Sequence, residues 1–166
     1  MRIIKLFLGV YLLFALSACQ NKAIDFNNKV AEIQTAVMPK VQALANKIST
    51  NTDTTNEGAA KLGTEAKGLV KELQDKLSEL KTLDVPAGGE EFRDAVVGQF
   101  NYQINYCSNY SKFVDSTSSD EVKQAALSAI LRQAQTADSV LESMLNAQKK
   151  FAQKYKLQIL PEKKEN

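Results

Sequence analysis

The sequence predicts an all-α protein, a single domain folded as an up-down-up-down four-helix bundle. Apolar residues recur in steps of three and four along four long segments, which is the spacing of one helix face. Proline and glycine are scarce, with three and seven in 166 residues, and no segment alternates with the period of a β-strand. Four amphipathic helices with short connections pack most simply with neighbouring helices antiparallel.

The first helix is expected over residues 26–48, and Asp25 is its candidate N-cap. Pro39 lies inside the helical pattern and removes one backbone donor, so we expect a bend near Val37 or Met38. The apolar register continues past the proline, which favours one bent helix over two. The predicted buried stripe comprises Phe26, Val30, Ile33, Val37, Val41, Leu44 and Ile48.

The second helix is expected over residues 57–83, after a polar loop at 49–56. Its outward face carries mixed charges, as on a solvated helix. Pro86 ends the helical pattern and Gly88 permits a turn. The predicted buried stripe comprises Ala59, Leu62, Ala66, Leu69, Leu73, Leu77 and Leu80.

The third helix is expected over residues 90–115 and the fourth over 119–155. Two glutamates open the third helix, where negative charge is favourable. Ser118, with Glu121 three residues later, is the candidate N-cap of the fourth. The stripe of the third helix comprises Phe92, Val96, Phe100, Gln103, Cys107, Tyr110 and Val114, and that of the fourth Val122, Ala126, Ile130, Ala137, Leu141, Met144, Phe151 and Tyr155.

The N-terminal residues have the order of an export signal. Arg2 and Lys5 precede an apolar run over residues 6–16, which is shorter than the roughly 20 residues that span a bilayer. The run ends in Leu16-Ser17-Ala18-Cys19, which resembles the lipobox of bacterial lipoproteins: an aliphatic residue, a small residue, Ala or Gly, then Cys. The alternative is an ordinary cleaved signal with a cysteine there by chance.

The lipobox resemblance implies cleavage after Ala18, diacylglycerol on the Cys19 sulfur and an acyl chain on the new amino terminus. The lipid would anchor the protein to a membrane of the bacterial cell envelope. Gln20 stands where an aspartate is associated with inner-membrane retention, which resembles the outer-membrane default of a Gram-negative host. The chain then divides into a signal peptide (1–18), a lipidated Cys19 with a short tether (19–25), the bundle (26–156) and a flexible tail (157–166).

Composition argues against several classes of function. The chain has no His, the commonest metal ligand and general base. Lipidation would leave one thiol, which excludes thiolate-rich zinc and iron–sulfur sites. Without Arg2 and Lys5, basic and acidic residues are equal in number, which disfavours nucleic acid as a partner. Gly58, Gly63 and Gly68 match no phosphate-binding loop and indicate close helix packing or a loose helix start. We therefore expect no enzymatic activity, no cofactor and no metal.

Three polar positions fall on predicted buried faces. Cys107 is expected to behave as a small hydrophobe, the alternative being a reactive or partner-linked thiol. Gln103 and Gln133 lie at nearly the same level if the turn between their helices centres near residue 117. Because buried amides must find partners, the two form either a polar layer that fixes helix register or polar contacts inside a ligand cavity.

Tyr102, Tyr106 and Tyr110 recur every four residues on the third helix, beside Asn105 and Asn109. One interpretation is packing at a helix seam, with the phenol groups reaching water. The other is an exposed tyrosine and asparagine surface that binds a protein, peptide or glycan.

Two functions remain open from the sequence. The first is an interaction module that docks an envelope protein or a surface polymer, which predicts a mostly filled core and a partly exposed tyrosine face. The alternative is a carrier of a small apolar ligand, which predicts a cavity of a few hundred Å³ near Gln103, Cys107 and Gln133.

Overall fold

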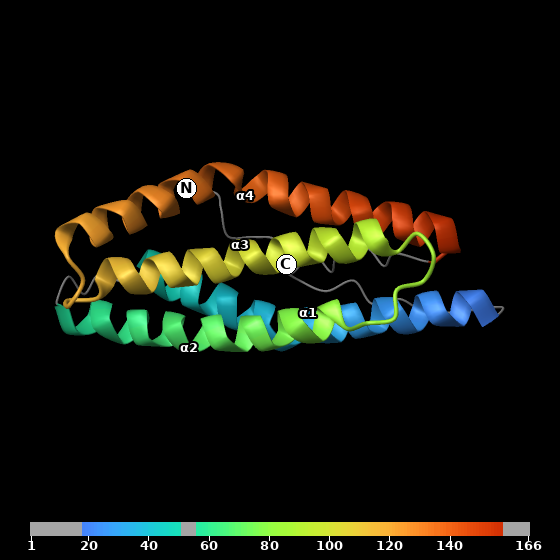
Figure 1. Cartoon of the computed structure of the whole chain (residues 1–166), viewed down its shortest axis with the longest axis horizontal. Helices are drawn as coiled ribbons and strands as arrows, with labels where there is room; N and C mark the ends of the chain where they lie inside the picture. The colour runs from blue at the N-terminus through green and yellow to red at the C-terminus, as the bar shows by residue number, and fades with distance from the viewer. Residues whose placement is uncertain (1–17, 51–55, 158–166) are drawn as a thin grey trace.

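A computed structural model of the chain describes residues 18–50 and 56–157. Its helices are α1 (Ala18–Thr50), α2 (Asn56–Lys81), α3 (Glu90–Val114) and α4 (Asp120–Tyr155). They run up, down, up and down along one long axis (Figure 1), and each packs on the next in sequence. The predicted all-α four-helix fold is confirmed. The predicted signal peptide up to residue 17, most of the first loop and the tail beyond Leu157 lie outside the described residues.

The helix α1 begins earlier than the sequence predicted. Asp25, the expected N-cap, lies inside the helix, and the expected tether over residues 19–25 is helical. Ala23 is fully buried and Phe26 is 2% exposed, so the buried stripe extends into the expected tether. Burial of apolar residues in these two extra turns outweighs the local preference of an aspartate for the N-cap position. The expected single helix across Pro39 is confirmed.

Two ion pairs link α1 and α2 along their outer side. Lys40 contacts Glu72, and Lys47 Nζ lies 2.8 Å from Glu65 Oε2. The second pair is seven residues further along α1 and seven residues back along α2, as two turns of antiparallel neighbours require. The side chains are partly exposed, so each pair contributes at most about 1 kcal/mol. The two ion pairs therefore mark the register of α1 against α2 but add little to the stability of the fold.

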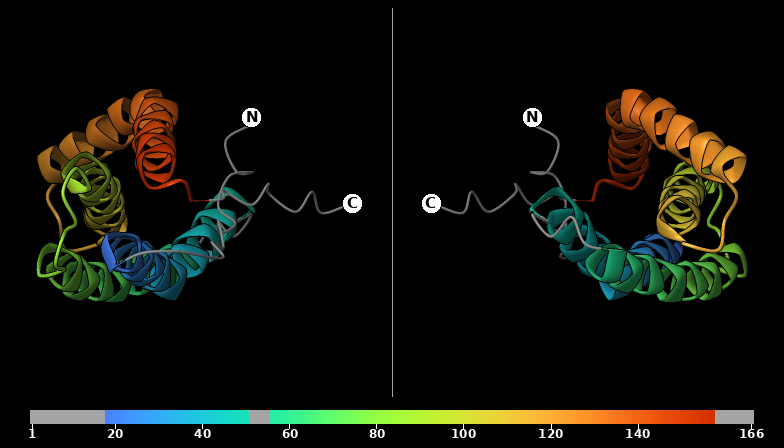
Figure 2. Two further views of the ribbon diagram at one scale, coloured as in Figure 1. Left: turned by 90° about the vertical axis from the view of Figure 1, so that its right-hand side faces the viewer. Right: turned by 90° about the vertical axis from the view of Figure 1, so that its left-hand side faces the viewer.

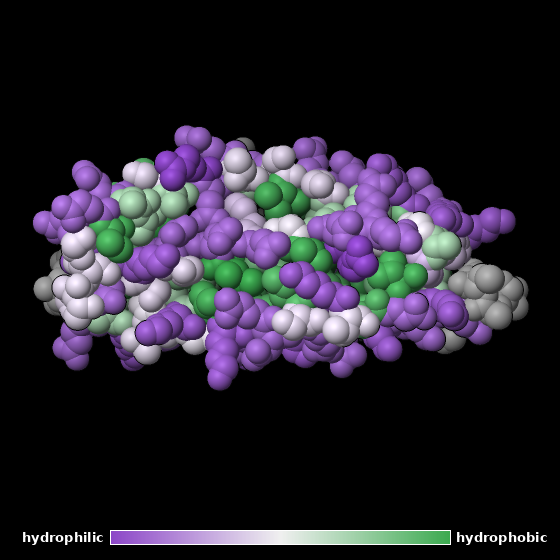
Figure 3. Space-filling model, viewed as in Figure 1, coloured by the Kyte–Doolittle hydropathy of each residue, from purple (hydrophilic) through white to green (hydrophobic). Residues whose placement is uncertain are grey.

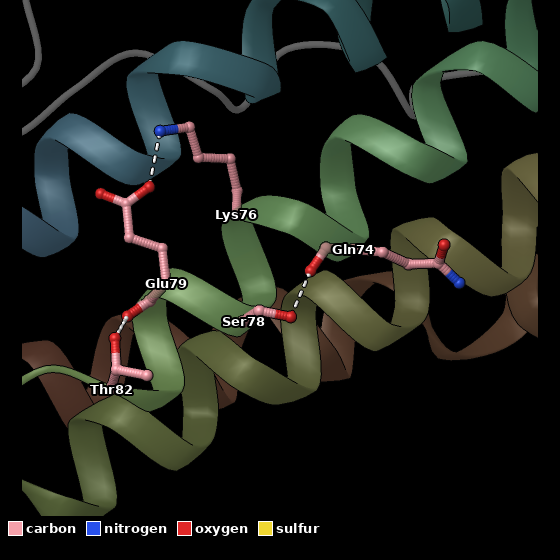
Figure 4. Close-up of polar contacts among 5 residues, drawn as sticks. All are labelled: Gln74, Lys76, Ser78, Glu79 and Thr82. Atoms are coloured by element: carbon pink, nitrogen blue, oxygen red, sulfur yellow. Dashed lines mark hydrogen bonds and ion pairs between the residues drawn. The ribbon is translucent and has the colours of Figure 1, made fainter.

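The outward face of α2 is charged, as the sequence predicted, and its polar groups bond locally (Figure 4). Lys76 Nζ lies 2.6 Å from Glu79 Oε2, and this hydrogen bond raises the pKa of the lysine. The hydroxyls of Ser78 and Thr82 donate to the main-chain oxygens of Gln74 and Glu79, at 2.9 and 2.8 Å. These contacts keep the face solvated and leave the opposite stripe for the core.

The helices α2 and α3 come close together at Gly63. A Cβ atom at this position would lie 2.4 Å from Val114 Cγ2 and 3.8 Å from the main-chain oxygen of Ser111. Gly68 differs, because a Cβ atom there would meet no atom within 4 Å. Of the two, only Gly63 serves close helix packing.

The connection between α2 and α3 is fastened to the end of α4. Lys154 Nζ and Tyr155 OH both donate to the main-chain oxygen of Ala87, at 2.5 and 2.8 Å. Gly88 has a φ of +81°, and a Cβ atom there would lie 2.1 Å from Lys154 Nζ. The left-handed backbone and the lysine together explain the glycine at the predicted turn.

Both ends of α4 are capped. Ser119 is the N-cap in place of the expected Ser118, and its hydroxyl accepts from a main-chain N–H three residues later at 3.4 Å. The extended backbone of Ser119 directs its side chain at the first turn. At the other end Lys156 is left-handed, and the N–H of Leu157 donates to the oxygen of Ala152 at 2.8 Å, as in a Schellman motif.

One hydrophobic core runs between the helices and uses most of the predicted stripe residues. At the end where α1 begins and α4 finishes, the rings of Phe26, Phe92 and Phe151 meet with centroids 5.4–6.1 Å apart. The ring of Tyr155 lies 5.0 Å from that of Phe151. We call these four residues the aromatic cluster. Each such ring pair contributes about 0.5–1.5 kcal/mol beyond its burial.

The bundle is closed at the aromatic cluster and open at its other end. Figure 2 shows α1 and α4 near each other at the closed end and diverging toward the end of α1 and the start of α4. Val122, expected on the buried face of α4, is accordingly 43% exposed. Periodicity identifies the apolar face of a helix but does not reveal whether another helix reaches it.

Gly63→Ala and Gly68→Ala should change stability in opposite directions. Alanine at 68 enters open space and should raise the free energy of unfolding by about 0.5–1 kcal/mol, the usual gain over glycine in a helix. Alanine at 63 must displace Val114, and overpacking should outweigh that gain and lower stability by about 1 kcal/mol. Urea unfolding followed by circular dichroism measures both. Equal effects of the two substitutions would contradict the close contact.

Candidate functional site

The tyrosine and asparagine stripe of α3 is partly exposed at Tyr102 and Tyr106, as the interaction module predicted, but it is not a fully open surface. Tyr110 is buried, Tyr102, Tyr106 and Asn109 are half-buried, and only Asn105 is exposed. A spacing of four residues turns each successive tyrosine about 40° further round the helix. The stripe therefore winds from the flank of α3 into the core, and the packing interpretation describes its tyrosines.

Burial controls the chemistry of these tyrosines. It raises the pKa of Tyr102, Tyr106 and Tyr110 above the usual value, and the nearby carboxylate of Asp138 adds to the effect on Tyr102. The phenols are thus neutral hydrogen-bond donors at neutral pH and beyond. None is placed to act as a general base, which would require the ionised form.

A reciprocal pair of hydrogen bonds joins α3 to α4. Tyr102 OH donates to the main-chain oxygen of Gln133 at 3.0 Å, and Gln133 Nε2 donates to the main-chain oxygen of Tyr102 at 3.1 Å. Gln103, the next residue on α3, is buried at the same level. Gln103 and Gln133 therefore lie at the same level along the bundle axis. The side chain of Gln133 nevertheless bonds to Tyr102, and its Oε1 has no hydrogen-bond partner.

The buried polar layer contains a third glutamine, Gln99, that was not among the predicted site residues. Gln99 is 2% exposed, and its Oε1 accepts from Gln34 Nε2 of α1 at 2.9 Å. Its Nε2 is buried without a hydrogen-bond partner. The signal was present, because Gln99 precedes Gln103 by four residues and so shares its face. The hydrogen bond of Gln99 joins α3 to α1 in this layer, and the hydrogen bond of Gln133 joins α4 to α3.

Cys107 is fully buried, as its place in the apolar stripe predicted. Desolvation by burial raises the pKa of its thiol to about 12. The thiolate is the reactive form of cysteine. The geometry therefore supports the small-hydrophobe interpretation over the reactive thiol.

Two surface hollows are each about 310 Å³ in volume. One lies between α1 and α2 beside the ion pairs at Lys40 and Lys47. The other lies in the corner where Phe113 of α3 approaches Leu127 of α4. Neither is lined by Gln103, Cys107 or Gln133, so neither is the cavity that the carrier alternative predicted.

The described residues contain no group of three His, Cys, Asp or Glu side chains that could hold a metal ion. Over the same part of the chain, no helix combines the length and the apolarity needed to cross a bilayer. The ion pairs of the described residues join exposed or partly exposed side chains, such as Lys150 Nζ and Glu91 Oε1 at 2.6 Å.

The largest exposed apolar side chains gather on α4 and the adjoining end of α3. Figure 3 shows apolar residues on this face of α4 among hydrophilic ones. The leucines of this surface lie beside the predicted core stripe of α4 and not on it, so the apolar spacing did not predict the surface. The exposed residues are Phe113, Val122, Leu127, Leu131 and Leu145.

Gln99→Met should raise the free energy of unfolding by about 1 kcal/mol. The substitution removes a buried donor without a partner, which costs about 1–3 kcal/mol, and it loses one ordinary hydrogen bond from Gln34. Methionine is long enough to fill the site. Tyr102→Phe is the control, because it removes a satisfied hydrogen bond and should lower stability by about 1 kcal/mol. A loss of stability in Gln99→Met would mean that Nε2 has a bonding partner.

Cys107 should resist alkylation in the folded protein. In a chain carrying Cys19→Ser, Cys107 is the remaining thiol. Burial raises the pKa of Cys107 from 9.0 to about 12, which lowers the fraction of thiolate at pH 8 about 1,000-fold. Mass spectrometry after iodoacetamide treatment should show labelling at least about 100-fold slower than in urea. Similar rates in both conditions would contradict the burial.

No protein-family model, no curated protein and no solved structure matches this chain.

Proposed function

We propose that the protein is a lipid-anchored component of the bacterial cell envelope that works by binding another macromolecule and not by catalysis. The observation that carries the anchor is the order Leu16-Ser17-Ala18-Cys19 at the end of a basic and apolar leader. Two or three acyl chains would hold the protein firmly, since one chain alone binds reversibly. In a Gram-negative host, Gln20 favours the outer membrane.

The start of α1 supports a close attachment. Cys19 lies in the first turn of a helix whose next turns, at Ala23 and Phe26, are buried in the core. A lipid on Cys19 would place the closed end of the bundle next to the membrane. The open end, with Leu127 and Leu131, would then point away from the bilayer, where a partner can reach it.

An interaction role accounts for the exposed apolar residues better than the carrier alternative does. A carrier needs an enclosed cavity that covers most of its ligand, whereas both described hollows are open surface features. Exposed apolar patches commonly mark protein interaction sites. The recognition surface that we propose is therefore on α4, in place of the tyrosine stripe of α3.

Cys19→Ser should abolish lipid attachment and release the processed domain from the membrane fraction, or leave the leader uncleaved. Metabolic labelling with a fatty acid, followed by cell fractionation, measures both effects. Cys107→Ala is the matched control, because it alters the other cysteine of the chain and should leave labelling unchanged. Undiminished labelling of Cys19→Ser would refute the anchor.

A further inference from the structure

Both ends of the described chain lie at the closed end of the bundle, where α1 begins and α4 finishes (Figure 1). The rings of Phe26 and Phe151 are 5.6 Å apart and mark a common level on these two antiparallel helices. Beyond that level, Lys22 lies four residues along α1 and Lys156 lies five residues along α4, or about 6 and 7.5 Å. Cys19 lies seven residues beyond Phe26, or about 10 Å. Both lysines are therefore within about 5 Å of the level of Cys19 along the bundle axis.

The closed end carries positive charge that is poorly matched by negative charge. Lys154 and Lys156 are exposed, and no carboxylate of the described residues forms an ion pair with either lysine. Lys154 Nζ bonds instead to a neutral main-chain oxygen, that of Ala87. Lys22 Nζ lies 3.5 Å from Asp84 Oδ2, but these side chains are 73% and 86% exposed. Such an exposed ion pair is weak, so Lys22 is able to exchange its partner.

The other acidic side chains near this end are compensated or lie further back. Glu91 Oε1 is 2.6 Å from Lys150 Nζ. Glu90 lies in the first turn of α3, where the positive end of the helix dipole stabilises a carboxylate. Asp25 lies six residues after Cys19, about 9 Å behind its level. Among the described residues, the outermost layer of the closed end therefore carries three lysines and one carboxylate.

A lipid on Cys19 would bring this layer to the membrane surface. Cleavage after Ala18 would make Cys19 the first residue, and Cys19 already lies in α1, so no free segment would separate the lipid from the bundle. The headgroup layer of one leaflet is roughly 5–7 Å thick, which matches the depth over which the lysines lie behind Cys19. Lysines at that depth are attracted to anionic lipids, and their ammonium groups bind phosphate as point charges.

We propose that the closed end of the bundle rests on the headgroups of anionic phospholipids, with Lys22, Lys154 and Lys156 at their phosphate groups. This inference rests on the proposed function, because it needs Cys19 at a membrane, and it adds a second contact to the lipid anchor. The lysines belong to α1 and to α4, so contact at both helices holds the long axis of the bundle upright on the membrane. The open end then stands about 54 Å from the closed end, the length of the 36 residues of α4.

The test uses the chain from residue 19 onward with Cys107→Ala, which leaves Cys19 as the single thiol. This thiol is coupled to a maleimide lipid in vesicles, so attachment does not depend on processing in cells. One set of vesicles contains phosphatidylcholine and phosphatidylglycerol, and the other contains phosphatidylcholine alone. A water-soluble acetylating ester modifies the exposed lysines, and mass spectrometry gives the rate at each position. Circular dichroism verifies that each coupled chain is folded.

Lys22 and Lys156 should be acetylated about fivefold more slowly on the anionic vesicles than on the neutral ones, because a lysine near an anionic surface gains about that factor in occupancy. Lys61 and Lys112, near the open end, should react at the same rate on both. Raising the salt concentration to about 1 M, where the Debye length falls to about 3 Å, should remove the difference.

Lys156→Glu should abolish the slow acetylation of Lys22, because it replaces attraction to the headgroups by repulsion at the same level. Lys112→Glu is the matched control. It also places a glutamate in the last turn of a helix, where negative charge is unfavourable, but it does so near the open end. It should leave the slow acetylation of Lys22 unchanged.

Equal rates on the two kinds of vesicle would overturn the proposal, because the lysines would then make no contact with anionic headgroups. Slow acetylation of Lys61 and Lys112 to the same degree as Lys22 would also overturn it, because the bundle would then lie along the membrane. Failure of the proposed anchor is distinguishable. Chemical coupling supplies the attachment in this experiment, whereas the fractionation of Cys19→Ser in cells measures the anchor.

Discussion

The aromatic cluster is the constraint on which the rest of this fold depends. Phe26, Phe92 and Phe151 bring together the first turns of α1 and α3 and the last turns of α4. Tyr155 extends the cluster and also bonds to the loop before α3 through the main-chain oxygen of Ala87. One end of the molecule is therefore held by ring packing and by hydrogen bonds together. It is the place where α1 and α4 meet.

Away from this end, the helices are aligned pairwise by different means. Ion pairs mark the register of α1 against α2, and the missing side chain of Gly63 lets α2 approach α3. The amide of Gln133 and the phenol of Tyr102 bond α3 to α4. Each of these contacts links helices that are adjacent in sequence, so none of them holds α1 against α4. The open end is the result.

The sequence could predict the helices because their stripes are long and regular. It placed α2, α3 and α4 within about two residues and identified nearly every core position. It failed where a local signal competed with packing: Asp25 resembles a cap, yet burial of Ala23 continues the helix through it. It also failed where the outcome depends on distant helices. The winding of the tyrosines into the core and the exposure of Val122 are set by where α4 and α1 lie, which no single segment encodes.

The long α4 helix has one further consequence for how the molecule moves. Its last turns lie in the aromatic cluster, where Phe151 contacts Phe26 of α1, whereas its extensive contacts are with α3. Phe151 is the clamp that ties α4 to α1. Leu127 is 24 residues from that clamp, about 36 Å at 1.5 Å per residue. A tilt of a few degrees at the clamp would therefore shift the distant leucine by some ångströms.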